Sequence, residues 1–241
     1  MALGDRRYMS QTQTQAGAAQ IDEGLRKYML GVYNYMALGV AFTGIVALFV
    51  ASQPALLEAI ALSNFRWVLF IGILGLGFFA PRVMMTGSMA MAHGAFWLYA
   101  AFWGALMSPM FLLYTGDSMV RVFFITAATF AGVSLYGYTT KRNLAPLGAF
   151  FAMATIGILV ALLVNVFLLQ SELFHLGLSI VVVLVFAGLT AYETQMIKSM
   201  YYEGDSSEVT SRKSIFGAFA LYGSFVTLFI WLLSIFGVAR E

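Results

Sequence analysis

Seven apolar stretches joined by short polar loops restrict what this chain can fold into more than any other feature. They cover about residues 29–51, 66–81, 89–113, 119–138, 144–169, 174–197 and 215–238. A helix needs about 20 mainly apolar residues to cross a bilayer, and most of these stretches have that length. The sequence is 61% hydrophobic and only 10% charged, whereas a soluble domain carries roughly 25% charged residues. We therefore expect an all-α membrane protein, with seven transmembrane helices in one domain over residues 25–241.

The stretch from residue 66 to residue 113 is the hardest to divide, because it is almost continuously apolar. Only Pro81, Arg82 and the turn-forming residues 86–88 interrupt it. Its length fits two crossings joined by a tight turn, which is the prediction. A single long, kinked helix is the alternative.

Residues 1–24 are polar and of mixed charge. They lack the apolar core of a signal peptide and have too little apolar content to fold alone, so we expect a flexible tail. Of the 13 lysines and arginines, ten fall on the side of this tail, and three, Arg66, Arg121 and Arg240, fall on the other. Loops rich in Lys and Arg stay in the cytoplasm, so the N-terminus is predicted inside and the C-terminus outside. The net charge of only +2 gives no reason to expect a nucleic-acid partner.

Glu193 is the only acid well inside any of the apolar stretches. A carboxylate at that depth costs free energy unless it is paired, hydrated or protonated, so it is a candidate functional group. It is predicted about four residues from the cytoplasmic end of its helix, roughly 6 Å deep. Arg82 is predicted at the same membrane face, and Thr190, three residues earlier, could donate a hydrogen bond.

Three interpretations of Glu193 stay open on the residues alone. The first is a structural ion pair with Arg82. The second is a gate at the cytoplasmic mouth, where protonation or calcium competes with Arg82 for the carboxylate. The third is a hydrated, unpaired acid. Apolar surroundings favour the neutral acid and Arg82 favours the carboxylate, so the two effects oppose each other.

A stripe of small and polar residues follows one side of the last predicted helix: Gly217, Ala220, Ser224 and Thr227. Small residues let helix backbones approach closely, so tight packing accounts for this stripe. The functional alternative is that this helix lies at the centre of the bundle and that its polar stripe meets Glu193. In the fifth predicted span, Asn165 is expected either to bridge helices by hydrogen bonds or to coordinate an ion.

Several motifs together resemble the bacterial branch of the Bax inhibitor 1 family, and they cover nearly everything after residue 25. They are RKYMLGVYNYM (26–36), SPMFLLYTG (108–116), FAGVSLYGYTTKRNL (130–144), LVNVFL (163–168), FAGLTAYETQMIKSMY (186–201) and LYGSFVTLF (221–229). The resemblance implies a seven-helix fold in which the last helix is surrounded by the other six. It also implies a pH-sensitive cation leak, chiefly of calcium, in the cytoplasmic (inner) membrane, without a cofactor.

In this family the pH response is attributed to two facing acids, with a basic residue that pairs with them in the closed state. Glu193 matches the first acid, and Arg82 approximately matches the basic residue. Ser224 stands where the second acid is expected, and coupled titration needs two ionisable groups. The resemblance therefore implies a gate with one acid, in which Glu193 is the sensor and Arg82 its counter-charge. Residues expected to line the pore or support the gate are Ser224, Thr227, Thr190 and Asn165.

Calcium favours six to eight oxygen ligands. Glu193 with nearby hydroxyls and carbonyls would therefore bind it only weakly and transiently, as a leak requires. The alternative function is a non-conducting membrane protein that modulates a membrane protease or a stress-response partner. Ser224 and the polar tail are the features that favour this alternative. An enzyme is not expected, because no nucleophile–base pair and no paired intramembrane acids stand out.

Overall fold

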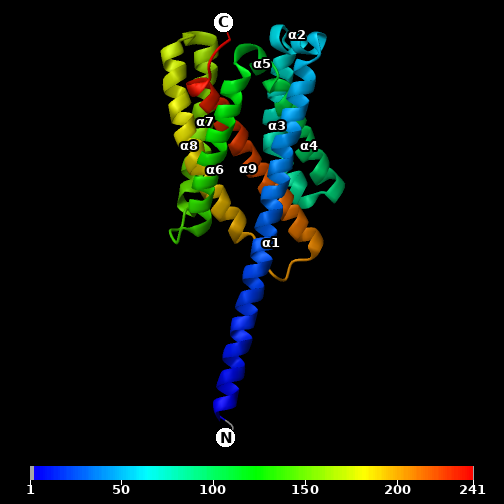
Figure 1. Ribbon diagram of the computed structural model, residues 1–241, viewed down its shortest axis with the longest axis vertical. Coiled ribbons are helices and arrows are strands. Elements are labelled where there is room, and N and C mark those ends of the chain that lie inside the picture. The colour runs from blue at the N-terminus through cyan, green and yellow to red at the C-terminus, as the bar shows by residue number, and fades with distance from the viewer. Residues whose placement is uncertain (1–2, 241) are drawn as a thin grey trace.

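Seven segments of the bundle are helices long and apolar enough to span a membrane (Figure 1). The computed structural model describes the backbone of residues 3–240 and the side chains of residues 23–240. Within that part of the chain the spans are Glu23–Ala51, Phe65–Thr86, Met89–Leu113, Gly116–Thr139, Ala145–Leu169, Glu172–Ser199 and Ser207–Phe236. The seven predicted spans are confirmed, with ends that shift by up to eight residues.

The long helices are α1 (Leu3–Ala51), α3 (Phe65–Thr86), α4 (Met89–Met107), α6 (Gly116–Thr139), α7 (Gly148–Val164), α8 (Glu172–Ser199) and α9 (Ser207–Phe236). The short ones are α2 (Pro54–Leu62), α5 (Met110–Leu113), the 3-10 turn η1 (Ala145–Leu147) and the π-helical turn η2 (Asn165–Leu169). The helix α2 was not predicted; it begins at Pro54, where the missing N–H costs a helix little. The side chains of residues 1–22 lie outside the described part, so the flexible tail over residues 1–24 stays a prediction.

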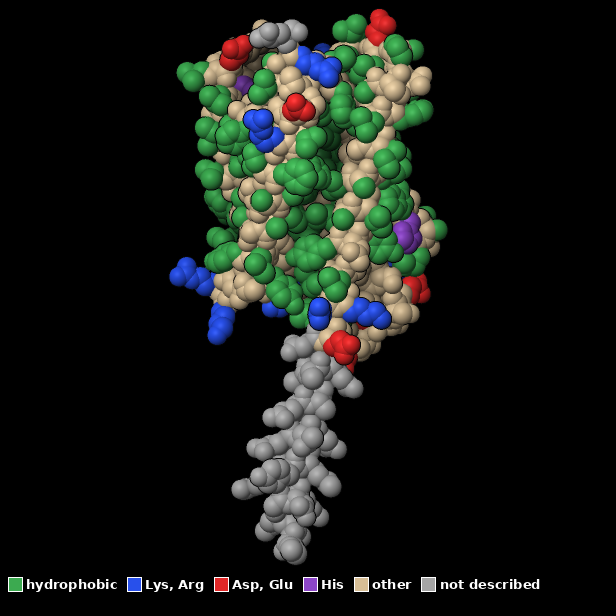
Figure 2. Space-filling model, in the orientation of Figure 1, with side chains coloured by type: hydrophobic (Ala, Val, Ile, Leu, Met, Phe, Trp, Pro, Cys, Tyr) green, Lys and Arg blue, Asp and Glu red, His purple; other side chains and the backbone are tan. Residues whose placement is uncertain are grey.

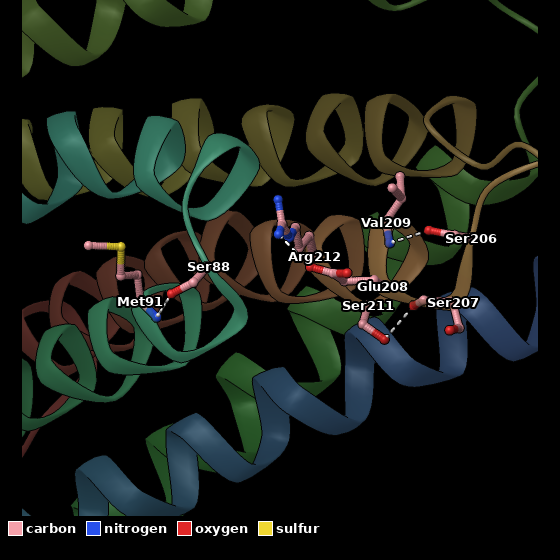
Figure 3. Close-up of polar contacts among 8 residues, drawn as sticks. All are labelled: Ser88, Met91, Ser206, Ser207, Glu208, Val209, Ser211 and Arg212. Carbon is pink, nitrogen blue, oxygen red and sulfur yellow. Dashed lines mark hydrogen bonds and ion pairs between the residues drawn. The ribbon is translucent and has the colours of Figure 1, made fainter.

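The turn between α3 and α4 settles how the long apolar stretch divides. The Gly87 N–H donates to the Val83 carbonyl and ends α3. Ser88 then begins α4 by accepting a hydrogen bond from the Met91 N–H at 3.3 Å (Figure 3). Two crossings are therefore confirmed and the single kinked helix is wrong. The predicted end of the second span at Pro81 was also wrong, because α3 continues to Thr86; membrane helices tolerate an internal proline.

The last helix, α9, forms the centre of the bundle, as predicted. In its most apolar stretch 56% of the residues are buried, against 6–33% in the other six spans. It packs against α1, α3, α4, α6 and α8. The contacts of α7 are mainly with α8 and with its own flanking turns, so α7 lies at the periphery.

The surface and the two ends of the bundle suit a protein embedded in a bilayer. Hydrophobic side chains cover the sides of the visible face, and Lys and Arg lie toward its ends (Figure 2). The start of α1 and the end of α9 lie at opposite ends (Figure 1). Near the C-terminus, the Arg240 N–H donates to the Leu113 carbonyl at 2.9 Å and the Thr115 N–H donates to the Val238 carbonyl at 3.0 Å. Which end faces the cytoplasm stays a prediction.

Candidate functional site

Glu193 lies on α8, six residues before the helix ends at Ser199. That places it about 9 Å from the end of the helix, at 1.5 Å per residue. This distance exceeds the predicted value of roughly 6 Å, because α8 continues two residues past the predicted end at Ile197. Its side chain is half-buried.

The carboxylate of Glu193 meets the polar stripe of α9. The Ser224 hydroxyl donates a hydrogen bond to Glu193 Oε2 at 2.7 Å. Ser224 itself is only 2% exposed, so this contact joins α8 to the central helix inside the bundle. The sequence expectation that the stripe meets Glu193 is therefore confirmed for Ser224.

Close helix packing on both sides holds α8 in place around Glu193. A Cβ atom at Gly217 of α9 would lie 2.9 Å from a methyl group of Ile197, so a glycine there lets α9 approach α8. On the other side, a Cβ atom at Gly137 of α6 would overlap the backbone of Ala191. Small residues thus set the helix separation at the site.

A cleft of about 700 Å³ opens beside this contact, between α3, α4, α7, α8 and α9. Most of its lining is apolar. The polar groups include Glu193, Ser224 and Thr227, with Tyr99 and Trp103 contributed by α4. Glu193 is therefore a wall residue of the cleft and is hydrogen-bonded through one carboxylate oxygen.

Arg82 is not brought together with Glu193. Its side chain is exposed, and the ion pairs found among residues 23–240 join Arg212 to Glu208 and Lys213 to Asp205, each at 2.5 Å. Pro81, the preceding residue, does line the cleft. Arg82 itself is not among the residues that line the cleft.

Both ion pairs belong to the first two turns of α9 and the loop before it. Ser206 begins α9 by accepting a hydrogen bond from the Val209 N–H at 3.3 Å, and Glu208 pairs with Arg212 one turn later (Figure 3). Lys213 Nζ also donates to the Met200 carbonyl at 2.7 Å. These contacts fix the α8–α9 loop without involving Glu193.

The other predicted site residues divide between the cleft and the rest of the bundle. Thr227 lines the cleft, three residues beyond Ser224. Thr190 is fully buried, and its hydroxyl donates to the Phe186 carbonyl at 2.7 Å instead of to Glu193. A threonine within a helix often makes this bond to the preceding turn.

Asn165 lies far from Glu193, in the turn between α7 and α8. Its side-chain oxygen accepts a hydrogen bond from the Ser171 N–H at 3.1 Å. Glu193 follows roughly 30 Å further along α8, at 1.5 Å per residue. Asn165 lies within the fifth span, as predicted, but only four residues before that span ends at Leu169.

The sequence reasoning missed that the two residues after Glu193 are also contact residues. The Thr194 hydroxyl lies 2.9 Å from that of Ser134 on α6, and Ser134 lies 2.7 Å from the hydroxyl of Tyr33 on α1. Gln195 accepts from the Leu144 N–H at 2.7 Å and donates to the Arg142 carbonyl at 2.8 Å. Three adjacent polar residues on one apolar helix were the available signal, since they point to different sides.

The oxygen donors at the cleft suit a passing cation better than a bound one. Among residues with described side chains, no group of three or more His, Cys, Asp and Glu could hold a metal ion. At Glu193 the cleft offers one carboxylate with the hydroxyl of Ser224. Further hydroxyls along its walls belong to Thr227, Tyr99, Thr155 and Tyr192. Calcium takes six to eight oxygen ligands, so water would have to supply most of them.

Comparison with known proteins agrees with the seven-helix architecture. A family model described as "Inhibitor of apoptosis-promoting Bax1" matches residues 25–241. An uncharacterized protein of Rickettsia prowazekii is 41% identical over 220 residues, which are 91% of this chain and 93% of that protein. The inner membrane protein YbhL of Escherichia coli K12 is 39% identical over 220 residues, 90% of this chain and 94% of YbhL. A Caulobacter vibrioides protein is 39% identical over 232 residues, 92% of each chain.

These relatives match along about nine tenths of the chain. The family model covers the helix that carries Glu193 and the central helix that carries Ser224. With seven membrane-spanning helices, the protein is a multi-pass protein of the inner membrane. It belongs to the Bax inhibitor 1 family.

Proposed function

We propose that the protein is a pH-sensitive cation leak, chiefly for calcium, gated at Glu193. One observation carries the proposal: a single carboxylate in a membrane-spanning helix is hydrogen-bonded to the central helix at the wall of a cleft. Acids in membrane spans are rare, and they mark ion pathways and proton relays. The contact joins α8 to α9. A path for ions along α9 would open when these two helices separate and close when they come together.

Protonation supplies the gating step in this proposal. A hydroxyl donating to an ionised carboxylate makes a hydrogen bond roughly twice as strong as one between neutral groups. A proton on Glu193 therefore weakens the bond to Ser224 and loosens α9 from α8. The leak increases as the pH falls, and the response follows one proton because one acid titrates.

In this proposal, Arg82 is the counter-charge of Glu193 in a closed state that differs from the arrangement of α3 described above. It lies one helical turn before the end of α3, and its neighbour Pro81 lines the cleft. A rotation of α3 by about 100° would bring Arg82 to the direction that Pro81 now has. A guanidinium in the cleft would hold the carboxylate and repel cations, which defines a closed state that competes with protonation.

Calcium flux into liposomes tests the proposal. Purified protein is reconstituted around a calcium dye, and influx is measured at several pH values. Glu193→Gln keeps the size and the hydrogen-bond acceptor but removes the titrating group. We expect flux that increases as the pH falls in the wild type, and flux without pH dependence in Glu193→Gln.

Glu172→Gln is the matched control, because Glu172 is an exposed acid in the first turn of the same helix. This control should keep the wild-type pH response. Absence of calcium flux, or equal pH responses in wild type and Glu193→Gln, would show that Glu193 is not the sensor.

A further inference from the structure

The cleft beside Glu193 has a side opening between α3 and α7. The α7 helix packs mainly on α8, so α7 and α3 form two walls, with α8 and α9 behind them. Leu74 and Phe78 of α3 and Ile156 of α7 line the cleft and are 42%, 78% and 64% exposed. These three residues therefore form the rim.

The rim lies at the depth of the hydrocarbon core. Leu74 is close to the middle of the span Phe65–Thr86, and Ile156 is close to the middle of the span Ala145–Leu169. Around them the outer surfaces of both helices are apolar and exposed, with Ile71 at 67% and Met153 at 66%. The opening is thus continuous with the surface that faces the lipid.

The interior of the cleft favours an apolar occupant. A volume of about 700 Å³ falls within the roughly 300–1,000 Å³ of ligand pockets. Away from Glu193 and the hydroxyls, the walls are apolar and give water few hydrogen-bond partners. At the centre of a bilayer, the molecules that reach such an opening are lipid chains.

We propose that an acyl chain of a bilayer phospholipid enters between α3 and α7 and occupies the cleft, next to the Glu193–Ser224 contact. The chain covers the carboxylate from the membrane side and keeps water and cations away from it. That effect on the leak rests on the proposed function, whereas chain binding does not. Lipid occupancy would then stabilise the closed state.

Trp103 provides a reporter for the chain. It lines the cleft, and its indole N–H is buried without a hydrogen-bond partner among the described residues. Bromine atoms attached to the middle of phosphatidylcholine chains quench tryptophan fluorescence on contact. The measurement uses the full-length chain in brominated bilayers, with Trp67, Trp97 and Trp231 changed to Phe. We expect strong quenching of Trp103, relative to bilayers without bromine.

Two glycines of α3 provide a matched pair of variants. A Cβ atom at Gly77, which lines the cleft, or at Gly75, which does not, would meet nothing within 4 Å. Gly77→Leu should therefore fill the cleft and abolish the quenching of Trp103. Gly75→Leu adds the same side chain outside the cleft and should leave the quenching unchanged.

Ile156→Phe is a second test, for use if Gly77→Leu does not fold. Its larger side chain narrows the opening from the α7 side and should reduce the quenching of Trp103. The proposal would be overturned if Trp103 were not quenched in the reporter protein that carries only the three Trp→Phe changes. Equal quenching in the filled and control variants would also overturn it. Quenching does not require ion flux. A protein in which Trp103 is quenched but which conducts no calcium would therefore contradict the proposed leak and leave the proposed acyl-chain site standing.

Discussion

Ser224 occupies the position opposite Glu193 and reaches its carboxylate at 2.7 Å. A serine hydroxyl donates a hydrogen bond but does not exchange a proton in the pH range where carboxylic acids titrate. Glu193 therefore has a partner that favours its ionised form without adding a second titrating group. The site responds to one proton, and a second acid at position 224 would change that number.

Ser224→Asp is expected to give a steeper dependence of calcium flux on pH than the wild type. Two carboxylates within contact distance titrate as a coupled pair, so two protons instead of one then enter the pH response. Flux into liposomes measured over several pH values gives the slope. Ser224→Asn has the shape of aspartate without its charge, so it should not steepen the response. An unchanged slope in Ser224→Asp would contradict the match of Ser224 to the family's second acid.

Glu193 could be predicted as a site residue from its chemistry alone, whereas the position of Arg82 could not. Glu193 stands out because an acid within an apolar span is costly wherever the helix points. Arg82 does not reach Glu193 because the direction of a side chain depends on how its helix is rotated in the bundle. A change of one position turns a side chain by about 100°. The pattern of residues in α3, apolar on all sides, does not define that rotation.

At the scale of single helices, α8 connects its neighbours through consecutive polar residues. Glu193 contacts α9, Thr194 contacts α6, and Gln195 holds the loop between α6 and α7. The ends of the spans were predicted to within eight residues, because hydropathy changes sharply at a membrane surface. These lateral contacts were not predicted, since they depend on which helices are neighbours.

Gly137→Ala is expected to separate α6 from α8 beside this set of contacts. The added methyl group would overlap the backbone of Ala191, which cannot change rotamer as a side chain can. Overpacking of this kind costs about 1–3 kcal/mol. Thermal unfolding in detergent should show the loss. Gly132→Ala on the same helix is the control, because its methyl group meets nothing within 4 Å. Equal melting temperatures in the two variants would contradict close contact at Gly137.

At the scale of the whole molecule, the arrangement around α9 was foreseen and the cleft was not. The stripe of Gly217, Ala220 and Ser224 predicted close packing of the last helix, and α9 is the most buried span. The cleft exists because α7 packs mainly on α8 and leaves space toward α3. Nothing in the uniformly apolar α7 specifies its distance from α3, so hydropathy alone does not predict such an opening.

The orientation of the bundle is the last prediction, and the absence of cysteine makes it straightforward to test. Glu172 begins α8 and Glu203 lies in the loop between α8 and α9, so these two exposed residues mark opposite ends of one span. Ten of the 13 lysines and arginines lie on the Glu203 side, which should therefore face the cytoplasm. A membrane-impermeant maleimide should label Glu172→Cys in intact spheroplasts and Glu203→Cys only after permeabilisation. The reverse pattern would place the inner half of α8, with Glu193, toward the outside and make external pH the signal that the carboxylate senses.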